Sequence, residues 1–300
     1  MTPRSYRTPL AFKTALEDRL RAASRGQFDL ERRRQLLVFH RFLARVAEQF
    51  GDSITLKGGL VLELRLARAR TTRDVDLRAT GDPRELLERL RAAAQSALGD
   101  YLTYEVQPDP DQPQIQNAGM KYDGERYRVE CKLAGRTYGR RFGVDVAFAD
   151  PILGAPDVIE VENVLGFAGI AAPKLRLYPV ETHIAEKLHA YTLPRDYLNS
   201  RVKDLPDLAL LATVRVLEGE RVRAAIAQTF DHRATHAVPT RVPQPPPEWA
   251  ETYAEMASEF DLEWRDLDTV TDAVARFLDP VLAGSHIARW DQRAWSWSEP

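Results

Sequence analysis

Hydrophobic residues recur every three or four positions near both ends of the chain and at every second position in much of its middle part. A period near 3.6 is typical of helices with one buried face, and alternation is typical of strands. The first pattern predicts helices over 8–25, 29–50, 60–67, 83–98, 180–192, 203–215, 218–229, 248–258 and 269–283. The second predicts strands over 54–57, 74–77, 101–106, 114–122, 126–134, 141–148 and 158–162. We therefore expect an α/β (α+β) fold, with an α/β lobe over residues 1–170 and a helical lobe over residues 171–300.

Polar residues and glycine mark where several of these elements begin or turn. Asp29 is predicted to cap the second helix, and Asp82, followed by Pro83 at the first helical position, is predicted to cap the fourth. Asp123-Gly124 separates two alternating runs and predicts a tight hairpin turn. The Pro-rich segment 239–247 predicts a stiff, extended connector within the helical lobe.

The composition is that of a folded globular protein. Of the 300 residues, 44% are hydrophobic and 29% are charged, which argues against a disordered or fibrous chain. The apolar runs are too short to cross a bilayer, and the N-terminal residues lack the charged-then-apolar order of an export signal. The single cysteine, Cys131, excludes an intrachain disulfide. We expect a cytoplasmic protein with no membrane partner.

Charge is unevenly distributed along the chain, although the net charge is only −2. Residues 1–48 contain eleven Lys and Arg against five Asp and Glu, whereas residues 248–279 contain two against ten. This asymmetry agrees with an N-terminal lobe that faces nucleic acid. It agrees equally with solvated helix faces, so both interpretations stay open.

A glycine turn followed by paired carboxylates is the first set of residues that suggests chemistry. The predicted strand 54–57 ends at Lys57, and Gly58-Gly59 then lets the backbone approach a ligand closely. The helix that follows would present free N–H groups to a phosphate. Asp74 and Asp76 lie two residues apart on a strand, so both carboxylates project from one face and are suited to Mg²⁺. A tight strand–helix connection without a ligand is the alternative for the glycines.

A third carboxylate interrupts an apolar strand at Asp145. A buried carboxylate needs a partner, such as a metal ion. If this strand lies beside the strand of Asp74 and Asp76, three carboxylates meet at one site, as phosphoryl or nucleotidyl transfer with two metals requires. The alternative is an aspartate that points to solvent from a half-exposed strand.

The predicted helical lobe contains a second set of charged residues. Lys187 lies on a helix whose other residues face the core, and Lys203 precedes Asp204 and Asp207, which are three apart and hence neighbours on a helix. Across a cleft from the carboxylates, the two lysines would hold a triphosphate. Helix capping and surface ion pairs are the alternative for each of these residues.

Other site types find little support in the sequence. His183, Glu186 and His189 are spaced three and three, which spreads them over a broad helix face, and His232 and His236 alone are weak evidence for zinc. Nucleophile-elbow, phosphate-loop and dinucleotide-binding motifs are absent from the sequence.

Five short motifs, in this order along the chain, resemble those of the AbiEii family of nucleotidyltransferase toxins, which includes the mycobacterial MenT toxins. They are KGG at 57–59, TTRDVDL at 71–77, VDV at 144–146, AEKLHA at 185–190 and RVKDLPDL at 201–208. The resemblance covers residues 30–215. It implies a bilobed fold of the DNA polymerase β-like nucleotidyltransferase superfamily, with a mixed sheet in the N-terminal lobe and a helical C-terminal lobe.

The resemblance also implies a function and roles for individual residues. Family members use an NTP with Mg²⁺, and some add nucleotides to the 3′ end of tRNA, which blocks translation; a cognate antitoxin counters the toxin. The implied metal ligands are Asp74 and Asp76, with Asp145 as the third carboxylate of the superfamily. The implied nucleotide-binding residues are Lys57, Gly58, Gly59, Thr72, Lys187 and Lys203, and Asp204 or Asp207 completes the catalytic set.

Three functions remain open, because the sequence does not identify the acceptor. The basic helices over 19–45 would bind the acceptor stem of tRNA through its phosphates. A small-molecule nucleotidyltransferase of the aminoglycoside-modifying type would use the same carboxylates. A non-catalytic nucleic-acid-binding regulator would need the basic helices and not Asp74 or Asp76.

Overall fold

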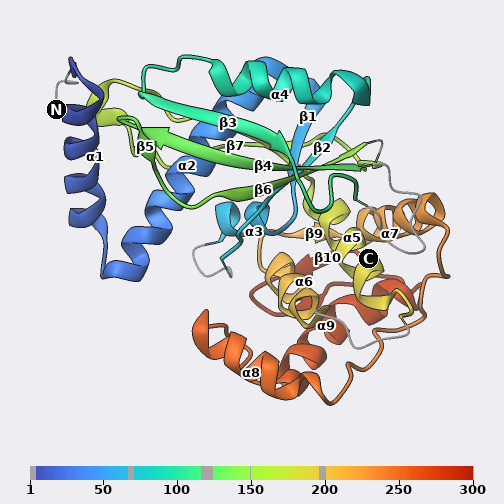
Figure 1. The fold of residues 1–300 in the computed structure, drawn as a ribbon. Coiled ribbons are helices and arrows are strands. Elements are labelled where there is room, and N and C mark those ends of the chain that lie inside the picture. Colours follow the sequence, from blue (N-terminus) through green and yellow to red (C-terminus); the bar gives the residue numbers. More distant parts are fainter. Residues whose placement is uncertain (1–4, 67–70, 116–123, 149, 196–200, 300) are drawn as a thin grey trace.

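The computed structural model describes residues 5–66, 71–115, 124–148, 150–195 and 201–299 (Figure 1). The helices are α1 (Pro9–Ala23), α2 (Gln27–Phe50), α3 (Gly59–Arg65), α4 (Leu86–Gln95), α5 (Val180–Thr192), α6 (Asp204–Ala212), α7 (Gly219–Arg233), α8 (Trp249–Glu259) and α9 (Leu267–Leu282). The strands of the main sheet are β1 (Ile54–Lys57), β2 (Val75–Ala79), β3 (Leu102–Pro108), β4 (Gly124–Leu133), β5 (Arg136–Thr137), β6 (Phe142–Phe148), β7 (Asp157–Glu160) and β8 (Lys174–Leu177). A second, small sheet joins β9 (Leu217–Glu218), β10 (Arg289–Asp291) and β11 (Ser296–Trp297).

The main sheet is mixed, and its strands follow the order β3-β4-β6-β2-β1-β8-β7, with β5 paired to β4. The central strands β2 and β6 run parallel, whereas β1 and β4 are antiparallel to the strands β2 and β6 beside them. Side chains alternate between the two faces of each strand, and the buried residues of β2, for example, are Val75, Leu77 and Ala79. The intervening side chains of β2 therefore belong to the opposite face, which carries polar groups.

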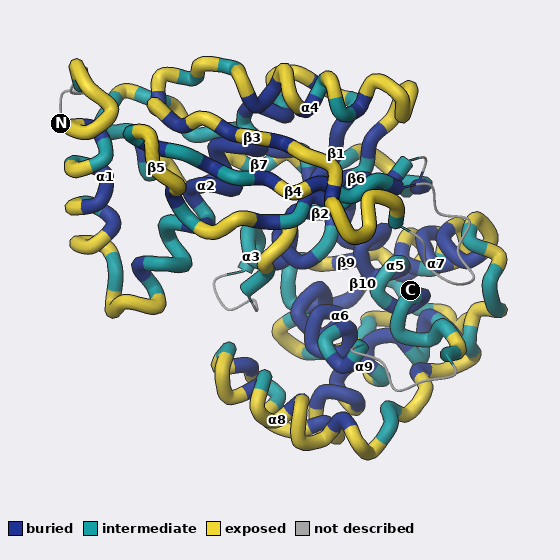
Figure 2. Tube along the Cα trace, in the orientation of Figure 1, coloured by how far each residue is buried: buried dark blue, intermediate teal, exposed yellow. Residues whose placement is uncertain are grey.

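The buried apolar side chains form two clusters. The first joins one face of the main sheet to α1, α2 and α4 and includes Phe12, Phe39 and Phe42. The second lies among α5, α6, α7, α8 and α9 and includes Trp290 and Phe277. Figure 2 shows α6 buried along its length, while α8 is largely exposed. Apart from Leu62 of α3, the buried residues of the second cluster all follow β8.

Most predicted helices and strands are present, and the differences have local causes. Asp29 does not cap α2, because the helix already starts at Gln27 after Gly26, and Asp29 instead accepts a hydrogen bond from the Arg25 amide. Asp82 caps as predicted, but a 3-10 turn, η2 (Pro83–Glu85), precedes α4. Strand β8, which is only four residues long, was not predicted. Most of the predicted strand 114–122, and Asp123 of the predicted hairpin turn, lie outside the described residues.

Four of the five arginines of α2 form ion pairs with residues outside the helix, so they offer less free charge to an acceptor stem than the sequence suggests. Arg32 pairs with Glu63, Arg34 with Glu17, and both Arg41 and Arg45 with Asp100. Burial lowers the pKa of Arg32 to about 10. The excess of basic residues in this region therefore reflects tertiary ion pairs more than an exposed cationic surface.

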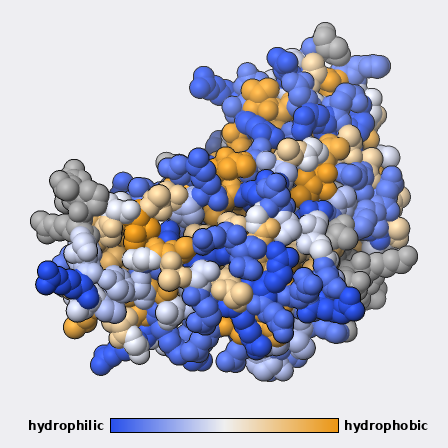
Figure 3. Space-filling model, turned by 90° about the horizontal axis from the view of Figure 1, so that it is seen from above, coloured by the Kyte–Doolittle hydropathy of each residue, from blue (hydrophilic) through white to orange (hydrophobic). Residues whose placement is uncertain are grey.

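On the face drawn in Figure 3, hydrophilic side chains cover most of the surface and hydrophobic ones lie between them in small groups. Among the helices that the structure describes, none combines the length and the apolar character needed to span a bilayer.

Candidate active site

Four charged side chains form a row across the polar face of the main sheet. Lys57 of β1 pairs in register with Asp76 of β2, Asp76 with Asp145 of β6, and Asp145 with Arg126 of β4. Residues opposite one another on neighbouring strands project from the same face. The strand register therefore places two carboxylates side by side, with a cation at each end of the row.

The glycine turn lies directly against Asp76. Gly58 has φ +70°, a left-handed conformation that favours glycine, and a Cβ added there would lie 1.9 Å from Asp76 Oδ2. Gly59 opens α3, which has only seven residues. The turn is thus shaped to leave room for a carboxylate, and a helix this short adds only a modest dipole to phosphate binding.

Asp74 precedes β2 and is exposed. Its Oδ1 accepts a hydrogen bond of 3.1 Å from the amide of Gly143, and a Cβ on Gly143 would come within 2.8 Å of the same oxygen. The Thr72 hydroxyl lies 3.4 Å from the carbonyl oxygen of Asp74. The segment before β2 is therefore anchored to the start of β6, which holds Asp74 at the same edge as Asp76.

The ionised carboxylate of Asp76 is disfavoured by its surroundings. Burial and the neighbouring Asp145 raise the pKa of Asp76 to about 6, although Lys57 and Lys187 act in the opposite direction. A divalent cation at this carboxylate would relieve the repulsion between the two aspartates.

Asp145 lies beside Asp76, because their two strands are adjacent, and its partner in the structure is Arg126. Arg126 donates from Nε and Nη2 to the two carboxylate oxygens, each at 2.7 Å. This bidentate geometry is among the strongest that arginine forms with a carboxylate. Arg126 was absent from the sequence prediction, because only the register of β4 against β6 brings it to the site.

Lys57 is also paired within the protein. Its ammonium group donates to Asp150 and, at 3.2 Å, to Oε1 of Glu186 on α5. Arg233 at the end of α7 contacts the same Glu186 oxygen, also at 3.2 Å. Glu186 thus joins a cation from the sheet to a cation from the helical lobe.

The helical lobe contributes Lys187 and two aspartates at the start of α6. The Lys187 ammonium lies 3.0 Å from Asp204 Oδ1 and 2.7 Å from Asp207 Oδ2, and both carboxylates are fully buried. Arg201, in the turn η4 (Arg201–Lys203), approaches Asp204 at 3.6 Å. The structure thus brings Lys187, Asp204 and Asp207 together, with the aspartates fixing the lysine.

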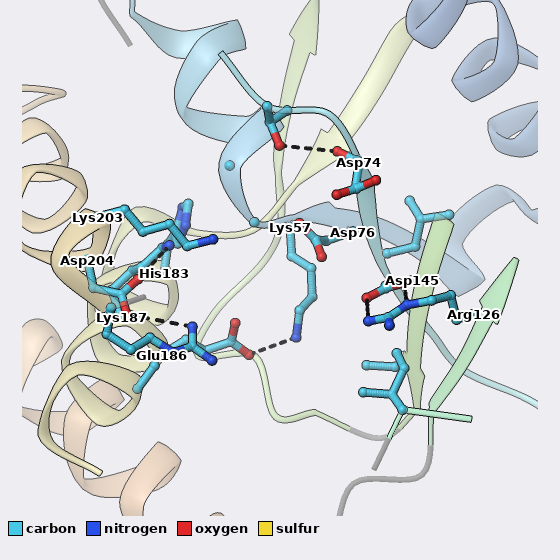
Figure 4. A pocket seen from close by; sticks show the side chains of 18 of the residues that line it. Lys57, Asp74, Asp76, Arg126, Asp145, His183, Glu186, Lys187, Lys203 and Asp204 are labelled. Atoms are coloured by element: carbon cyan, nitrogen blue, oxygen red, sulfur yellow. Dashed lines mark hydrogen bonds and ion pairs between the residues drawn. The ribbon is translucent and has the colours of Figure 1, made fainter. Parts of the chain in front are cut away.

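A cavity of about 390 Å³ lies between the sheet edge and the helical lobe. In Figure 4, Lys57 and Glu186 point toward one another, Asp145 faces Arg126 on one side, and Lys187, Lys203 and Asp204 lie on the other. The predicted residues that line it are Lys57, Gly58, Gly59, Thr72, Asp74, Asp76, Asp145, Lys187, Lys203 and Asp204. Asp207 is not among its lining residues and acts through Lys187. Arg126, Arg201 and Arg233 also line it, so the wall is richer in cations than predicted.

The oxygen ligands at this edge suit Mg²⁺ bound together with a substrate. No three His, Cys, Asp or Glu side chains within the described ranges are grouped so that they could hold a metal ion alone. Mg²⁺ usually takes one or two carboxylates from a protein and completes its shell with water and substrate phosphates. Asp74 and Asp76 fit that pattern better than a site made of three carboxylates, because Asp145 is engaged by Arg126.

His183 lines the same cavity and is 1% exposed, yet neither ring nitrogen has a hydrogen-bond partner among the described residues. Burial, with the charge of Lys187 nearby, lowers the pKa of His183 to about 3. The ring is therefore neutral at pH 7 and offers one donor and one acceptor toward a ligand. The sequence around His183 does not indicate this role, since its spacing from Glu186 and His189 bears only on metal binding.

We expect acid to destabilise the fold through His183 and His40. Burial lowers the pKa of His40 to about 4, so in both cases the unfolded chain binds a proton below about pH 6.5 that the folded chain does not. These two residues therefore leave the free energy of unfolding unchanged above about pH 6.5 and lower it below that pH, by about 2 kcal/mol for each residue at pH 5. Urea denaturation at pH 7 and pH 5 measures this loss. An unchanged pH slope in a His40→Gln/His183→Gln variant would contradict the assignment.

The comparisons with known proteins cover most of the chain. The family model described as "Nucleotidyl transferase AbiEii toxin, Type IV TA system" matches residues 41–280. No curated protein matches the sequence. The solved structure of MenT4, nucleotidyltransferase toxin Rv2826c from Mycobacterium tuberculosis H37Rv, is similar with a TM-score of 0.56 and 17% identity, over 94% of this chain and 92% of that chain. JHP933 from Helicobacter pylori has a TM-score of 0.45 and 14% identity, over 83% and 92% respectively. The likeness to MenT4 confirms the predicted α/β fold.

Proposed function

Because this chain belongs to the AbiEii family of nucleotidyl transferase toxins of type IV toxin–antitoxin systems, we propose that it transfers a nucleoside monophosphate from an NTP to the 3′ end of tRNA. Pyrophosphate would be released, and a blocked tRNA 3′ end would halt translation. We further propose that a cognate antitoxin counters the toxin and that the reaction takes place in the cytoplasm.

One observation carries the proposal: Asp74 and Asp76 border a cationic cavity at the glycine turn and face Lys187 across it. Paired carboxylates supply hard oxygen ligands, and the lysines and arginines of the wall supply charge for phosphates. The volume of about 390 Å³ falls within the usual range of small-molecule sites.

Each group of the site has a role in this reaction. Asp74 and Asp76 would hold Mg²⁺, which when bound supplies positive charge to the transferring phosphoryl group. Lys57, Lys187 and Lys203 would neutralise the triphosphate, and Asp204 and Asp207 keep Lys187 in place. The acceptor hydroxyl would attack the α-phosphorus and release its proton to water as the bond to the pyrophosphate oxygen breaks.

Asp145 receives a different role from that first expected. Since both of its oxygens accept hydrogen bonds from Arg126, a metal ion would have to displace a guanidinium to reach it. We assign to Asp145 the positioning of Arg126 at the rim, where the guanidinium faces incoming phosphates.

We propose tRNA as the acceptor because the motifs resemble those of the family, and the cations of the cavity wall are compatible with it. Arg201 and Lys203 line the cavity on the helical-lobe side. Cations at the mouth of an active site favour a polyanionic acceptor and make binding salt-dependent. The paired arginines of α2 are not part of this proposal.

The decisive experiment incubates the purified protein with each α-labelled NTP, Mg²⁺ and total tRNA. We expect label on tRNA with at least one NTP, no label after EDTA, and recovery when Mg²⁺ is restored, because the transferring phosphoryl group needs the metal charge. Label on an aminoglycoside but not on RNA would instead identify a small-molecule nucleotidyltransferase. NTP binding or tRNA binding without transfer would favour a non-catalytic regulator.

A further inference from the structure

Arg233 is a cavity residue that lies outside every motif singled out in the sequence. It is the last residue of α7, its side chain is only 8% exposed, and it lines the cavity beside Glu186. Ala234, which follows it, has φ +48°, so the chain reverses direction immediately after the helix. This reversal brings Thr235 and His236 back against His189 of α5.

A chain of hydrogen bonds runs from Arg233 into α5, and its direction can be read from its two ends. Arg233 Nη1 can only donate, so Nδ1 of His189, 3.2 Å away, accepts, and the ring proton lies on Nε2. His189 Nε2 then donates to Thr235 Oγ1 at 2.8 Å. At the far end, the Thr192 hydroxyl donates to the carbonyl oxygen of Leu188 at 2.9 Å.

The middle of the chain follows from these two ends. Because the Thr192 proton is used on Leu188, Nε2 of His236, 2.8 Å from Thr192 Oγ1, must donate, and Nδ1 of His236 must accept from Thr235 at 2.9 Å. Each contact then has one donor and one acceptor, and both histidines are neutral. Burial lowers the pKa of His189 to about 3 and also lowers that of His236, which agrees with this state.

The other side of the Arg233 guanidinium lies at the cavity wall, against Glu186. Nη2 lies 3.2 Å from Glu186 Oε1, the oxygen that Lys57 Nζ also contacts at 3.2 Å. Two cations from different lobes thus converge on one anionic oxygen, as they would on a phosphate oxygen.

We propose that Arg233 binds the β- and γ-phosphates of the NTP, and that His189 is a positioning residue that aims the guanidinium through the hydrogen-bond chain. This inference rests on the proposed function, because it assumes an NTP in the cavity. Loss of Arg233 removes charge-assisted hydrogen bonds to the leaving pyrophosphate. The effect should therefore fall on the NTP affinity and on the rate of transfer of the folded variant.

The test measures binding of ATP, CTP, GTP and UTP, each with Mg²⁺, by calorimetry, together with steady-state transfer of label. For the NTP that binds best, we expect Arg233→Ala to weaken binding by about ten- to hundred-fold. Arg233→Lys keeps the positive charge but lacks the planar guanidinium with its several N–H donors. It should therefore recover only part of the lost NTP affinity. Arg221→Ala, on the exposed first turn of the same helix, is the matched control and should bind like wild type.

His189→Ala tests whether His189 orients the Arg233 guanidinium or only supports the fold. We expect a smaller rise in KM than for Arg233→Ala, and no further rise in the double variant, because His189 acts through Arg233. His232 is an exposed histidine on α7, and His232→Ala should change neither NTP binding nor KM.

Equal NTP binding by wild type and by folded Arg233→Ala and Arg233→Lys overturns this inference and leaves the proposed function standing. Additive effects in the double variant overturn the role of His189, and failure of wild type to bind any NTP overturns the proposed function as well.

Discussion

Asp76→Asn should abolish nucleotidyl transfer while the protein stays folded. The substitution keeps the shape of the side chain but removes the negative charge that would hold Mg²⁺ beside the glycine turn. We expect a loss of activity of about a thousand-fold or more, since electrostatic stabilisation of the transition state is usually the largest catalytic contribution. Asp74→Ala, which removes the other proposed oxygen ligand, should cause a comparable loss. The labelled-NTP assay measures both.

The same substitution should not destabilise the protein. Burial and Asp145 raise the pKa of Asp76, so the ionised carboxylate costs free energy in the folded state. A neutral amide relieves that cost, and we expect a thermal midpoint equal to or above that of wild type, as is common when a functional charge is removed. Asp268→Asn is the matched control, because Asp268 belongs to another Asp-x-Asp triplet and is exposed on α9. More than a tenth of wild-type activity in Asp76→Asn would disprove the assignment.

Arg45→Ala should lower the free energy of unfolding by about 3–5 kcal/mol, the range typical of removing one partner from a buried ion pair. Arg45 and Asp100 are both fully buried, and the two Nη atoms of Arg45 donate to the two oxygens of Asp100 at 3.0 and 2.6 Å. The guanidinium also donates to the carbonyl oxygens of Ser96 and Leu102. Alanine leaves the Asp100 carboxylate with Arg41 alone and opens a void next to Tyr104.

Urea denaturation at pH 7 measures this loss, with Arg33→Ala as the control. Arg33 pairs with Asp29 one helical turn away and is partly exposed, so its removal should cost less than about 1 kcal/mol. Burial alone would raise the pKa of Asp100, but Arg45 and Arg41 outweigh it and lower the pKa. The contribution of the pair is therefore present above the unfolded pKa of about 3.9 and disappears as the pH falls through the lower folded pKa. Similar losses for the two variants would show that the network does not carry this stability.

Local sequence patterns determined the elements of this protein and the identity of much of its site. The hydrophobic period predicted the helix that became α5 to the residue, and alternation predicted β1, β4 and β6 with small shifts. Gly58-Gly59 and Asp-x-Asp could be recognised because a left-handed turn and a pair of carboxylates on one strand face are encoded within a few residues. Such features need no knowledge of which segments meet.

Tertiary structure alone decided which charges face one another. Arg126 reaches Asp145 only through the register of β4 against β6, and Arg233 reaches Glu186 only because α7 packs on α5. The arginines of α2 looked like an exposed cationic surface, and packing turned Arg41 and Arg45 inward toward Asp100. Burial and pairing depend on partners tens of residues away, and they set the free energy of each charge. Periodicity within a short window contains no information about those partners.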